Sequence, residues 1–563
     1  MSYTNERNHQ ILIALLKIHH IRRIIVSPGM TNSVFVGSVQ NDSDFEVYSC
    51  VDERSAAYMA CGLSLETNEP VIISCTGATA ARNYMSGATE AYYSKLPILI
   101  LTSSQPSRNI GHLFAQVTDR TSPPQDTCNL SIELPTCNSK EEEWFCEVQA
   151  NKALSELKRK GGGPVHINLI TTYSYNEKTA LTATKLPLSR FIYRITSMDR
   201  KPLLVGIKNA VFVGSHKKWT VELTQSVELF CEKYNAVVFC DHTSNYHGRY
   251  KIPFAIGINQ APINKANIPA YEVDTLIHIG EITGEEGAPR MIRSKQTWRV
   301  SEDGEMRDYF RNMVYVFEMP EQQFFTNYCN SQIKAKNTSY YEECQVDYKK
   351  LIRLRDSQLG DLPFSNVWIA EKTAPAIPDN STVMLSILNT LRTWNYAEFR
   401  NSVDVFCPVG GFGIDGATSM ILGASLANPD KFYYGITGDL AFFYDLNALG
   451  NRHVGHNLRI LLINNGLGFE FKKSYAMAYR LMADEVDSYV AAAGHFGRKS
   501  PDLVRNYAEN LGFEYLSASS KEEYENVFQR FVTTERVDHP MLLECFVASD
   551  DESVALNMIH NRT

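Results

Sequence analysis

Short, uniformly apolar runs that alternate with helical patterns are the feature that most restricts the fold of this chain. The run Pro97-Ile-Leu-Ile-Leu-Thr102 is apolar at successive positions, which fits a strand buried on both faces. Further strands are predicted at residues 24–27, 71–75, 165–169, 210–214, 236–240, 275–280, 382–387, 431–435, 458–463 and 541–547. Strands that alternate with helical segments predict an α/β fold with open, mostly parallel sheets.

The predicted elements form three blocks in the 563 residues, at residues 1–180, 195–345 and 367–563. A chain of this length has room for three large domains at about 100–200 residues each. Helices are predicted at residues 84–96, 221–234, 500–511 and 521–533. We expect blocks one and three to have similar architectures, and we expect the charged, tyrosine-rich residues 332–366 to link blocks two and three.

Composition excludes several classes of protein. Hydrophobic residues make up 44% of the chain and charged residues 21%, as in globular proteins with large cores. The formal charge is −8 without a basic stripe, so no nucleic-acid partner is expected. The polar first ten residues and the charges that interrupt the next apolar stretch predict neither a signal peptide nor a membrane span, hence a cytoplasmic protein. The twelve cysteines form no C-x-x-C pair, which predicts free thiols.

The pair Gly438-Asp439, followed by Asn464-Asn465, is the most informative motif. Each half follows a predicted strand, and the carboxyl ends of strands in open α/β sheets are where ligands bind. Gly438 is expected to permit a tight turn. Asp439, Asn465 and the backbone carbonyl of Leu467 are candidate ligands of an octahedral Mg²⁺ ion, because that ion prefers oxygen donors. The amides of Leu440 and Ala441 would open a helix and could hold phosphate.

This motif resembles the diphosphate–Mg²⁺ motif of the thiamine-diphosphate enzymes. The sequence from Gly438 to Asn447 and the Gly-Ile-Asp-Gly at residues 413–416 resemble those of the SEPHCHC (2-succinyl-5-enolpyruvyl-6-hydroxy-3-cyclohexene-1-carboxylate) synthases of menaquinone biosynthesis. The segments at residues 26–29, 52–57, 75–80 and 90–94 also resemble that branch. The resemblance implies a pyrimidine-binding domain at 1–180, a central domain at 195–345 and a diphosphate-binding domain at 367–563, with thiamine diphosphate and Mg²⁺ as cofactors.

The resemblance also implies roles for individual residues. Glu53 would hydrogen-bond N1′ of the aminopyrimidine, although taken alone it fits a surface or helix-start carboxylate. Gln116 would face the reacting centre, and Ile414 would support the bent cofactor, although a core isoleucine fits its sequence equally well. The further residues expected to bind the cofactor are Pro28, Gly29, Asn389, Thr390, Gly411, Gly413 and Gly468.

The match fails where that family uses cations to bind carboxylates. Uncharged residues stand at four such places, namely Thr31, Gln105, Val409 and Gln296, and Arg392 is out of register with a further family arginine. Each charge-assisted pair contributes about 1.5–3 kcal/mol, so the substrates of that family should not bind in the same way. Glu470 replaces an aliphatic residue and could contact a substrate, transfer a proton or point to solvent. The candidate substrate residues are Thr31, Gln105, His112, Gln116, Glu470 and Phe471.

These observations predict a thiamine-diphosphate- and Mg²⁺-dependent decarboxylase and C–C ligase, a transferase or lyase. It would join a decarboxylated 2-oxo acid to an acceptor other than isochorismate. The alternatives are a genuine SEPHCHC synthase that uses 2-oxoglutarate and isochorismate, a non-ligating decarboxylase, a flavin oxidase of the same superfamily and a non-catalytic homologue that binds a partner. The resemblance further implies a homodimer or homotetramer, in which Glu53 and Asp439 meet across a subunit interface.

Overall fold

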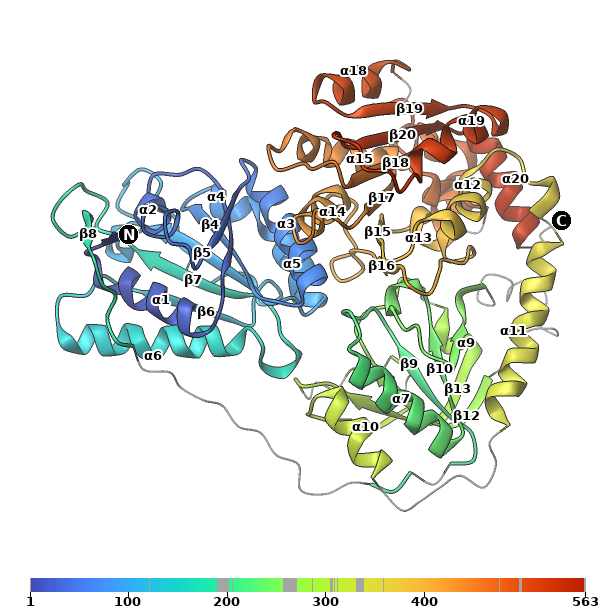
Figure 1. The fold of residues 1–563 in the computed structure, drawn as a ribbon, viewed down its shortest axis with the longest axis horizontal. Helices are drawn as coiled ribbons and strands as arrows, with labels where there is room; N and C mark the ends of the chain where they lie inside the picture. The colour runs from blue at the N-terminus through green and yellow to red at the C-terminus, as the bar shows by residue number, and fades with distance from the viewer. Residues whose placement is uncertain are drawn as a thin grey trace. The chain divides into compact units, whose positions relative to one another are not determined.

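Three six-stranded parallel sheets form the framework of the protein (Figure 1). The computed structural model describes residues 2–560 apart from residues 121, 190–201, 205, 257–270, 286, 304–306, 308, 311, 331–338, 358, 475 and 496–498. The first sheet has the order β3-β2-β4-β5-β7-β6. Its strands are β2 (Arg23–Val26), β3 (Glu46–Ser49), β4 (Val71–Thr76), β5 (Ile98–Ser104), β6 (Leu130–Leu134) and β7 (Val165–Ile170).

The second sheet has the order β11-β10-β9-β12-β13-β14. All its strands are parallel, but successive strands are added on one side of β9 as far as β11 and then on its other side from β12 onward. Its strands are β9 (Asn209–Val213), β10 (Ala236–Cys240), β11 (Lys251–Pro253), β12 (Tyr271–Ile279), β13 (Ile292–Val300) and β14 (Met313–Phe317). This order is typical of dinucleotide-binding folds. The connection that follows β9 nevertheless has a single glycine, Gly214, and lacks the G-x-G-x-x-G pattern that holds a pyrophosphate.

The third sheet has the order β16-β15-β17-β18-β20-β19. Its strands are β15 (Thr382–Leu385), β16 (Asp404–Phe406), β17 (Tyr433–Gly438), β18 (Leu458–Asn464), β19 (Glu514–Ala518) and β20 (Met541–Phe546). When the strands of each sheet are numbered from one in chain order, the first and third sheets have the same order, 2-1-3-4-6-5. The expected similarity between the first and third blocks is therefore confirmed at the level of topology.

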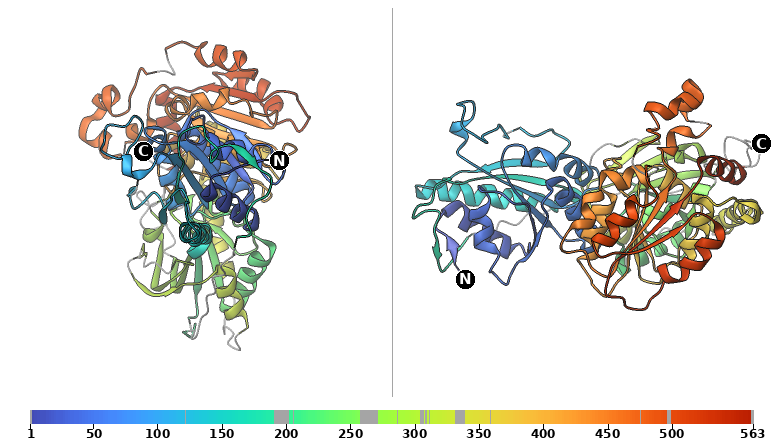
Figure 2. Two further views of the ribbon diagram at one scale, coloured as in Figure 1. Left: turned by 90° about the vertical axis from the view of Figure 1, so that its left-hand side faces the viewer. Right: turned by 90° about the horizontal axis from the view of Figure 1, so that it is seen from above.

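Helices cover both faces of the sheets (Figures 1 and 2). On the first sheet, α1 (Arg7–Ile18), α2 (Ser33–Val39) and α6 (Lys140–Glu156) pack on one face. The other face packs against α3 (Glu53–Thr67). On the second sheet, α7 (Val221–Tyr234) and α10 (Glu321–Cys329) cover one face, and α9 (Ala288–Met291) and α11 (Tyr340–Asp356) cover the other.

The remaining helices include two short ones between strands of the first sheet, α4 (Ala80–Asn83) and α5 (Met85–Tyr93). The helices of the third block are α12 (Asn366–Thr373), α13 (Asn389–Trp394), α14 (Ala417–Ser425), α15 (Asp439–Tyr444), α16 (Met477–Met482), α17 (Val486–Tyr489), α18 (Leu503–Asn510), α19 (Lys521–Phe531) and α20 (Ser549–Ile559). No helix in the described part of the chain combines the length and the apolar character that crossing a membrane requires.

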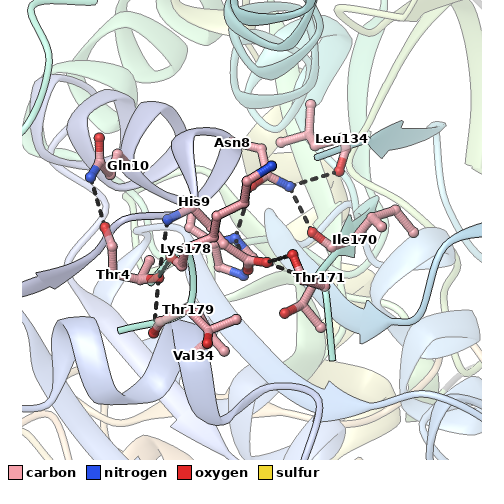
Figure 3. A network of polar contacts seen from close by, with 12 residues as sticks. Thr4, Asn8, His9, Gln10, Val34, Leu134, Ile170, Thr171, Lys178 and Thr179 are labelled. Carbon is pink, nitrogen blue, oxygen red and sulfur yellow. Dashed lines mark hydrogen bonds and ion pairs between the residues drawn. The ribbon is translucent and has the colours of Figure 1, made fainter. Parts of the chain in front are cut away.

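A polar network fixes the start of the chain against the first sheet (Figure 3). The strand β1 (Tyr3–Thr4) pairs with β8 (Leu181–Ala183) in an antiparallel manner. The Asn8 side chain in α1 donates hydrogen bonds to the carbonyls of Leu134 (3.1 Å) and Ile170 (2.7 Å), at the ends of β6 and β7. These buried bonds satisfy strand-end carbonyls that would otherwise lack donors, so they fix α1 at the carboxyl edge of these two strands.

The chain divides into two compact units that do not follow the sequence blocks. Unit 1 contains residues 1–197, 410–427 and 451–453, and unit 2 contains the rest. In unit 1, α14 packs directly on α3: a Cβ at Gly62 would lie 1.5 Å from the carbonyl oxygen of Met420, and one at Gly423 would lie 1.8 Å from that of Met59. The two contacts are reciprocal and run in reversed order, as in a pair of helices related by a local two-fold axis.

The predicted strands are all present, within a few residues of the expected bounds. Strands β3, β6, β13, β16 and β19 were not predicted, because polar residues interrupt their apolar pattern. The short strand β11 and the apolar strand β14 (Met313–Phe317) were also missed. Residues 332–366, which were predicted to link blocks two and three, contain α11 at residues 340–356, and this helix packs on the second sheet. Its buried residues Tyr340, Cys344 and Tyr348 recur at a spacing of four, which is a helical signal.

Candidate active site

Asp439 and Asn465 lie at the carboxyl edge of the third sheet, at the ends of neighbouring strands. Gly438 at the end of β17 is paired with Ile463 in β18, so the two motif halves end at the same level of the sheet. Asp439 is the first residue of α15 and is 2% exposed, while Asn465 is 9% exposed. The topology therefore brings together the two side chains that the sequence predicted as metal ligands.

The role predicted for Gly438 needs correction. Its φ of −81° and ψ of 161° describe extended backbone, so no tight turn requires glycine here. Instead, a Cβ at Gly438 would meet no atom of the described chain within 4 Å apart from its two neighbours in sequence. Such open space beside a buried carboxylate is what a diphosphate group and its metal would need.

Hydrogen bonds orient the amide and carbonyl donors around this edge. The backbone N–H of Leu467 donates to Oδ1 of Asn465 (3.3 Å), and the Leu467 carbonyl accepts from the N–H of Phe469 (3.0 Å). Each of these oxygens keeps a second lone pair. Behind them, Glu552 is buried and hydrogen-bonds the Asn465 side chain, and burial raises its pKa to about 7. Asn465 is thus held from behind by an acid that the sequence reading did not identify.

The other candidate diphosphate residues lie at the same edge. Leu440 and Ala441 fall in the first turn of α15, where backbone N–H groups lack intrahelical acceptors. Leu388, which stands where the resemblance expects glycine, has a φ of 67° just before α13. Oδ1 of Asn389 is buried and finds no donor among the described residues. A half-turn of that amide would present its NH₂ group in the same place.

The residues present therefore fit the groups that the motif implies. Carboxylate, amide and carbonyl oxygens form a donor set for Mg²⁺, and the open space at Gly438 and the first-turn amides fit a diphosphate. Thr390 is buried in α13 at this edge. Gly468 lies close to Leu440, since a Cβ there would lie 3.2 Å from the Leu440 side chain.

Glu53 occupies the start of α3 in unit 1. Asp52 caps the helix by accepting hydrogen bonds from the backbone N–H groups of Arg54 and Ser55. The half-buried Glu53 accepts a hydrogen bond from the Asn83 side chain (3.0 Å). Its carboxylate is therefore positioned by α3 and α4 together.

The glycine-rich loop that precedes α14 packs on the same unit. The N–H of Gly411 donates to Oε2 of Glu90 (2.6 Å), and Tyr58 donates to Oδ1 of Asp415 (2.9 Å). Glu90 is 1% exposed, and burial raises its pKa to about 7. A buried acid thus holds the backbone beside Gly413 and Ile414. Glu90 belongs to the segment 90–94 that resembles the family, but its local sequence, Thr-Glu-Ala, does not indicate this contact.

The remaining first-block candidates have different surroundings. A Cβ at Gly29 would lie 2.5 Å from the Thr76 side chain, so the segment after Pro28 closely approaches the end of β4. His112 and Gln116 are exposed, and Gln116 has a φ of 60°. No contact that His112 or Gln116 makes with the described residues tests the substrate roles predicted for them, which remain predictions.

The four positions that lack the expected cations have other functions in the fold. Thr31 donates to the carbonyl of Ser103 (2.7 Å) and is hydrogen-bonded to Thr76. Val409 is fully buried. Gln105 donates to the Ala115 carbonyl (3.4 Å), and Gln296 donates to Oγ1 of Thr275 (2.9 Å).

Glu470 belongs to a buried ionic cluster in unit 2. Its carboxylate lies 2.5 Å from Nη1 of Arg392 and 2.7 Å from Nζ of Lys473. Burial raises its pKa, but the cations of Lys473 and Arg392 outweigh burial, so the pKa lies below its ordinary value. The alternative in which Glu470 points to solvent is therefore wrong. Phe471, beside it, is 38% exposed.

Comparison with known proteins agrees with this geometry. The description "Thiamine pyrophosphate enzyme, N-terminal TPP binding domain" matches residues 7–123, and "Thiamine pyrophosphate enzyme, C-terminal TPP binding domain" matches residues 390–545. The chain therefore carries both of the TPP-binding domains that characterise the thiamine pyrophosphate enzymes.

Within that class, the chain is similar to 2-succinyl-5-enolpyruvyl-6-hydroxy-3-cyclohexene-1-carboxylate synthases. It is 28% identical to the protein of that name from Phocaeicola vulgatus, over 98% of each chain. It is 27% identical to the one from Bacteroides fragilis, also over 98% of each chain, and 27% identical to the one from Flavobacterium psychrophilum, over 89% of this chain and 92% of that one. The similarity thus extends across the central block, which neither domain description covers.

Proposed function

We propose that this chain is a thiamine-diphosphate- and Mg²⁺-dependent enzyme that decarboxylates a 2-oxo acid. It then joins the remaining fragment to an acceptor other than isochorismate. The observation that carries the proposal is the edge of the third sheet, where Asp439 and Asn465 follow neighbouring strands and open space lies at Gly438. The enzyme would be a transferase in this reaction and a lyase if it only decarboxylates.

The cofactor, when bound, supplies a nucleophilic carbon and accepts the electron pair that decarboxylation leaves behind. Asp439, Asn465 and the Leu467 carbonyl would hold the metal and so orient the diphosphate. Glu53 would share a proton with the pyrimidine nitrogen N1′, and its hydrogen bond from Asn83 fixes the orientation of the carboxyl group. Glu90 would hold the backbone at Gly411 in place.

The choice of acceptor rests on the uncharged positions. A cation at Thr31 would displace its hydrogen bond to the Ser103 carbonyl, and one at Val409 would be fully buried. Neither Thr31 nor Val409 therefore offers a cation of its own to a substrate carboxylate. An acceptor that depends on the family's set of arginines would lose about 1.5–3 kcal/mol of binding free energy for each missing pair.

A second candidate is a SEPHCHC synthase that uses 2-oxoglutarate and isochorismate. The observation that favours it is the similarity to proteins of that name over 98% of both chains. Incubation of the enzyme with these two substrates, thiamine diphosphate and Mg²⁺ distinguishes the candidates. Formation of the succinylated cyclohexene product identified by mass spectrometry would contradict an altered acceptor.

The cofactor assignment is tested first and separately. Calorimetry with thiamine diphosphate and Mg²⁺ should show saturable binding, and CO₂ release should then follow with at least one of a panel of 2-oxo acids. Glu53→Gln should bind the cofactor and yet fail to exchange the C2 proton with deuterium. Glu141→Gln, which changes an exposed carboxylate on α6, is the matched control and should exchange normally. No cofactor binding by the wild-type protein would reject the proposal.

Assembly and compartment complete the proposal. A homodimer or homotetramer in the cytoplasm is what the resemblance implies, with a small-molecule 2-oxo acid and an acceptor as the partners of the site. Light scattering after size-exclusion chromatography measures the assembly, and a monomeric holoenzyme with full activity would contradict it.

A further inference from the structure

Arg120 is a buried cation that forms no ion pair among the described residues, although the adjacent Asp119 acts to raise its pKa. It is 5% exposed, and its Nε and Nη2 atoms are buried without a hydrogen-bond partner among the described residues. Tyr84 and Cys75 exert the strongest electrostatic influence on it after burial. Neither is ionised at neutral pH, because burial raises the pKa of Cys75 to about 12 and that of Tyr84 well above its ordinary range.

A buried guanidinium group without hydrogen-bond partners destabilises the folded protein unless a ligand binds it. Burial of an ion costs several kcal/mol unless it is paired and hydrogen-bonded, and a guanidinium group does not escape the cost by losing its proton. Folded proteins therefore pair their buried arginines or supply them with a ligand. Two unused, buried N–H-bearing atoms on one guanidinium group point to an anion from outside the chain.

The position of Arg120 locates that anion at the ligand-binding edge of the first sheet. A Cβ on Gly77, directly after β4, would lie 2.2 Å from Nη2, so the guanidinium group lies against the backbone there. The preceding residue, Thr76, is hydrogen-bonded to Thr31, one of the positions that lacks an expected cation. The side chain of Arg120 thus brings a positive charge close to the position from which the arginine is missing.

The same edge carries the carboxylate of Glu53. Cys75, in β4, is influenced electrostatically by both Glu53 and Arg120. Helix α4 contacts both regions: Asn83 donates to Glu53 (3.0 Å), and Arg82 donates to the carbonyl of Asp119 (2.8 Å), which precedes Arg120. Arg120 is therefore held on the same short framework as the acid predicted to act on the cofactor.

We propose that Arg120 binds a carboxylate group of the substrate, and specifically one that the reaction does not remove. The reason for this restriction is that a fixed cation on the departing carboxylate would stabilise the ground state and slow the loss of CO₂. The ligand is thus the distal carboxylate of a dicarboxylic 2-oxo acid or a carboxylate of the acceptor. This inference rests on the proposed function for its place in the reaction, but the anion site itself does not.

The first test measures anion binding without the cofactor. Succinate and 2-oxoglutarate should raise the melting temperature of the wild-type protein and of Arg22→Gln, an exposed arginine that precedes β2 at the opposite end of the sheet. They should not raise that of Arg120→Gln, and Arg120→Lys should respond weakly, since lysine lacks the planar fork. Equal stabilisation of all four proteins, or of none, would overturn the anion site whatever the fate of the proposed function.

The second test separates a binding role from a structural role. Without ligands, Arg120→Gln should melt at the wild-type temperature or above it, because the variant removes an unpaired buried charge. A lower melting temperature accompanied by equal loss of all activities would assign Arg120 to the fold and reject the proposal.

Kinetics with the loaded enzyme identify the source of the carboxylate. For Arg120→Gln, cofactor affinity should be unchanged, and KM should rise about 10- to 150-fold, which corresponds to one charge-assisted hydrogen-bonded pair. A rise confined to 2-oxoglutarate, with pyruvate unaffected, identifies the donor, and a rise confined to a carboxylate-bearing acceptor identifies the acceptor. Unchanged KM values for every substrate would overturn the inference.

Discussion

The first and third sheets share one strand order but carry different chemistry at equivalent positions. Ser27 donates its N–H to the Ser74 carbonyl (2.9 Å), and Ser386 donates to the Ile436 carbonyl (2.8 Å), which aligns β2 and β4 with β15 and β17. With this alignment, Gly77 corresponds to Asp439. The strand pairings of β5 and β18 extend the alignment, so that Gln105 corresponds to Asn465.

The comparison shows how one topology provides two complementary halves. In the third sheet, the position after the central strand holds a carboxylate, Asp439, which can bind a cation. In the first sheet, the equivalent position is Gly77, and the guanidinium group of Arg120 lies against it. The backbone arrangement thus determines where a ligand can bind, and the side chain at the strand end determines its charge. If this is correct, the carboxyl edges of the first and third sheets should bind different ligands although their strand order is the same.

The largest effect is expected at the carboxylate of the third sheet. Asp439→Ala should weaken cofactor binding by on the order of 100-fold or more, because even residues that only orient metal ligands contribute 10- to 100-fold. Calorimetry with thiamine diphosphate and Mg²⁺ measures this. Asp430→Ala, whose side chain is 77% exposed, is the control and should bind normally. If Arg120→Gln weakened cofactor binding as much as Asp439→Ala does, the proposed division of roles would be incorrect.

The next effect concerns the contact between α3 and α14. Gly62→Ala and Gly423→Ala should each lower the free energy of unfolding by about 3 kcal/mol, because the new methyl group meets backbone that cannot move alone. Urea denaturation measures both. Gly360→Ala, where a Cβ would meet no atom within 4 Å, should change stability little. Clearly unequal losses at the two glycines would argue against a local two-fold relation.

The third prediction compares two buried acids, Glu90 beside the glycine-rich loop and Glu552 behind Asn465. Burial raises the pKa of each to about 7, from 4.5 in the unfolded chain. The folded protein therefore retains protons that the unfolded chain releases, and each group's stabilisation is lost as pH rises from about 4.5 to 7. Between pH 4.5 and 8, the stability of Glu90→Gln relative to wild type should increase by at most about 3 kcal/mol.

Denaturation at the two pH values measures this change for both acids. Glu552→Gln should show the same trend, and Glu141→Gln, on an exposed site, should show none. A stability difference that is constant with pH would show that the two carboxyl groups titrate in the folded protein as they do in the unfolded chain.

The smallest effect is expected at Leu388, which the alignment matches to Gly29. Its positive φ of 67° should cost about 1–2 kcal/mol in any residue with a Cβ. Leu388→Gly should therefore be more stable than Leu388→Ala by about 1 kcal/mol, although alanine is the more stabilising residue at ordinary positions. Thermal denaturation of the two variants checks the order, and the reverse order would show that the backbone is unstrained there.

Sequence reasoning succeeded where local composition carries the information. The central strands are apolar on both faces, so they could be recognised one at a time. The proximity of Asp439 and Asn465 followed from parallel strands that end at one edge. Edge strands such as β3 and β19 were missed because one face contacts solvent and their polar residues interrupt the apolar run.

Burial of single charges could not be predicted in the same way. Arg120 lies in a polar Thr-Asp-Arg segment that is typical of an exposed loop, and its burial depends on β4, which is distant in sequence. Glu90 is similar, because its partner Gly411 comes from another block. Glu470 could be recognised as unusual, and Lys473 is only three residues away, but the ion pair with Arg392 depends on how this segment packs against α13.

The reciprocal contact between α3 and α14 has a consequence for how the site can change in evolution. Glu53 lies nine residues before Gly62, and Ile414 lies nine residues before Gly423, so the acid and the aliphatic residue occupy corresponding places relative to one crossing point. A larger residue at either glycine would move both helices apart and displace both side chains together. We therefore expect the two glycines to be retained together, because a side chain at either position would meet the backbone of the other helix.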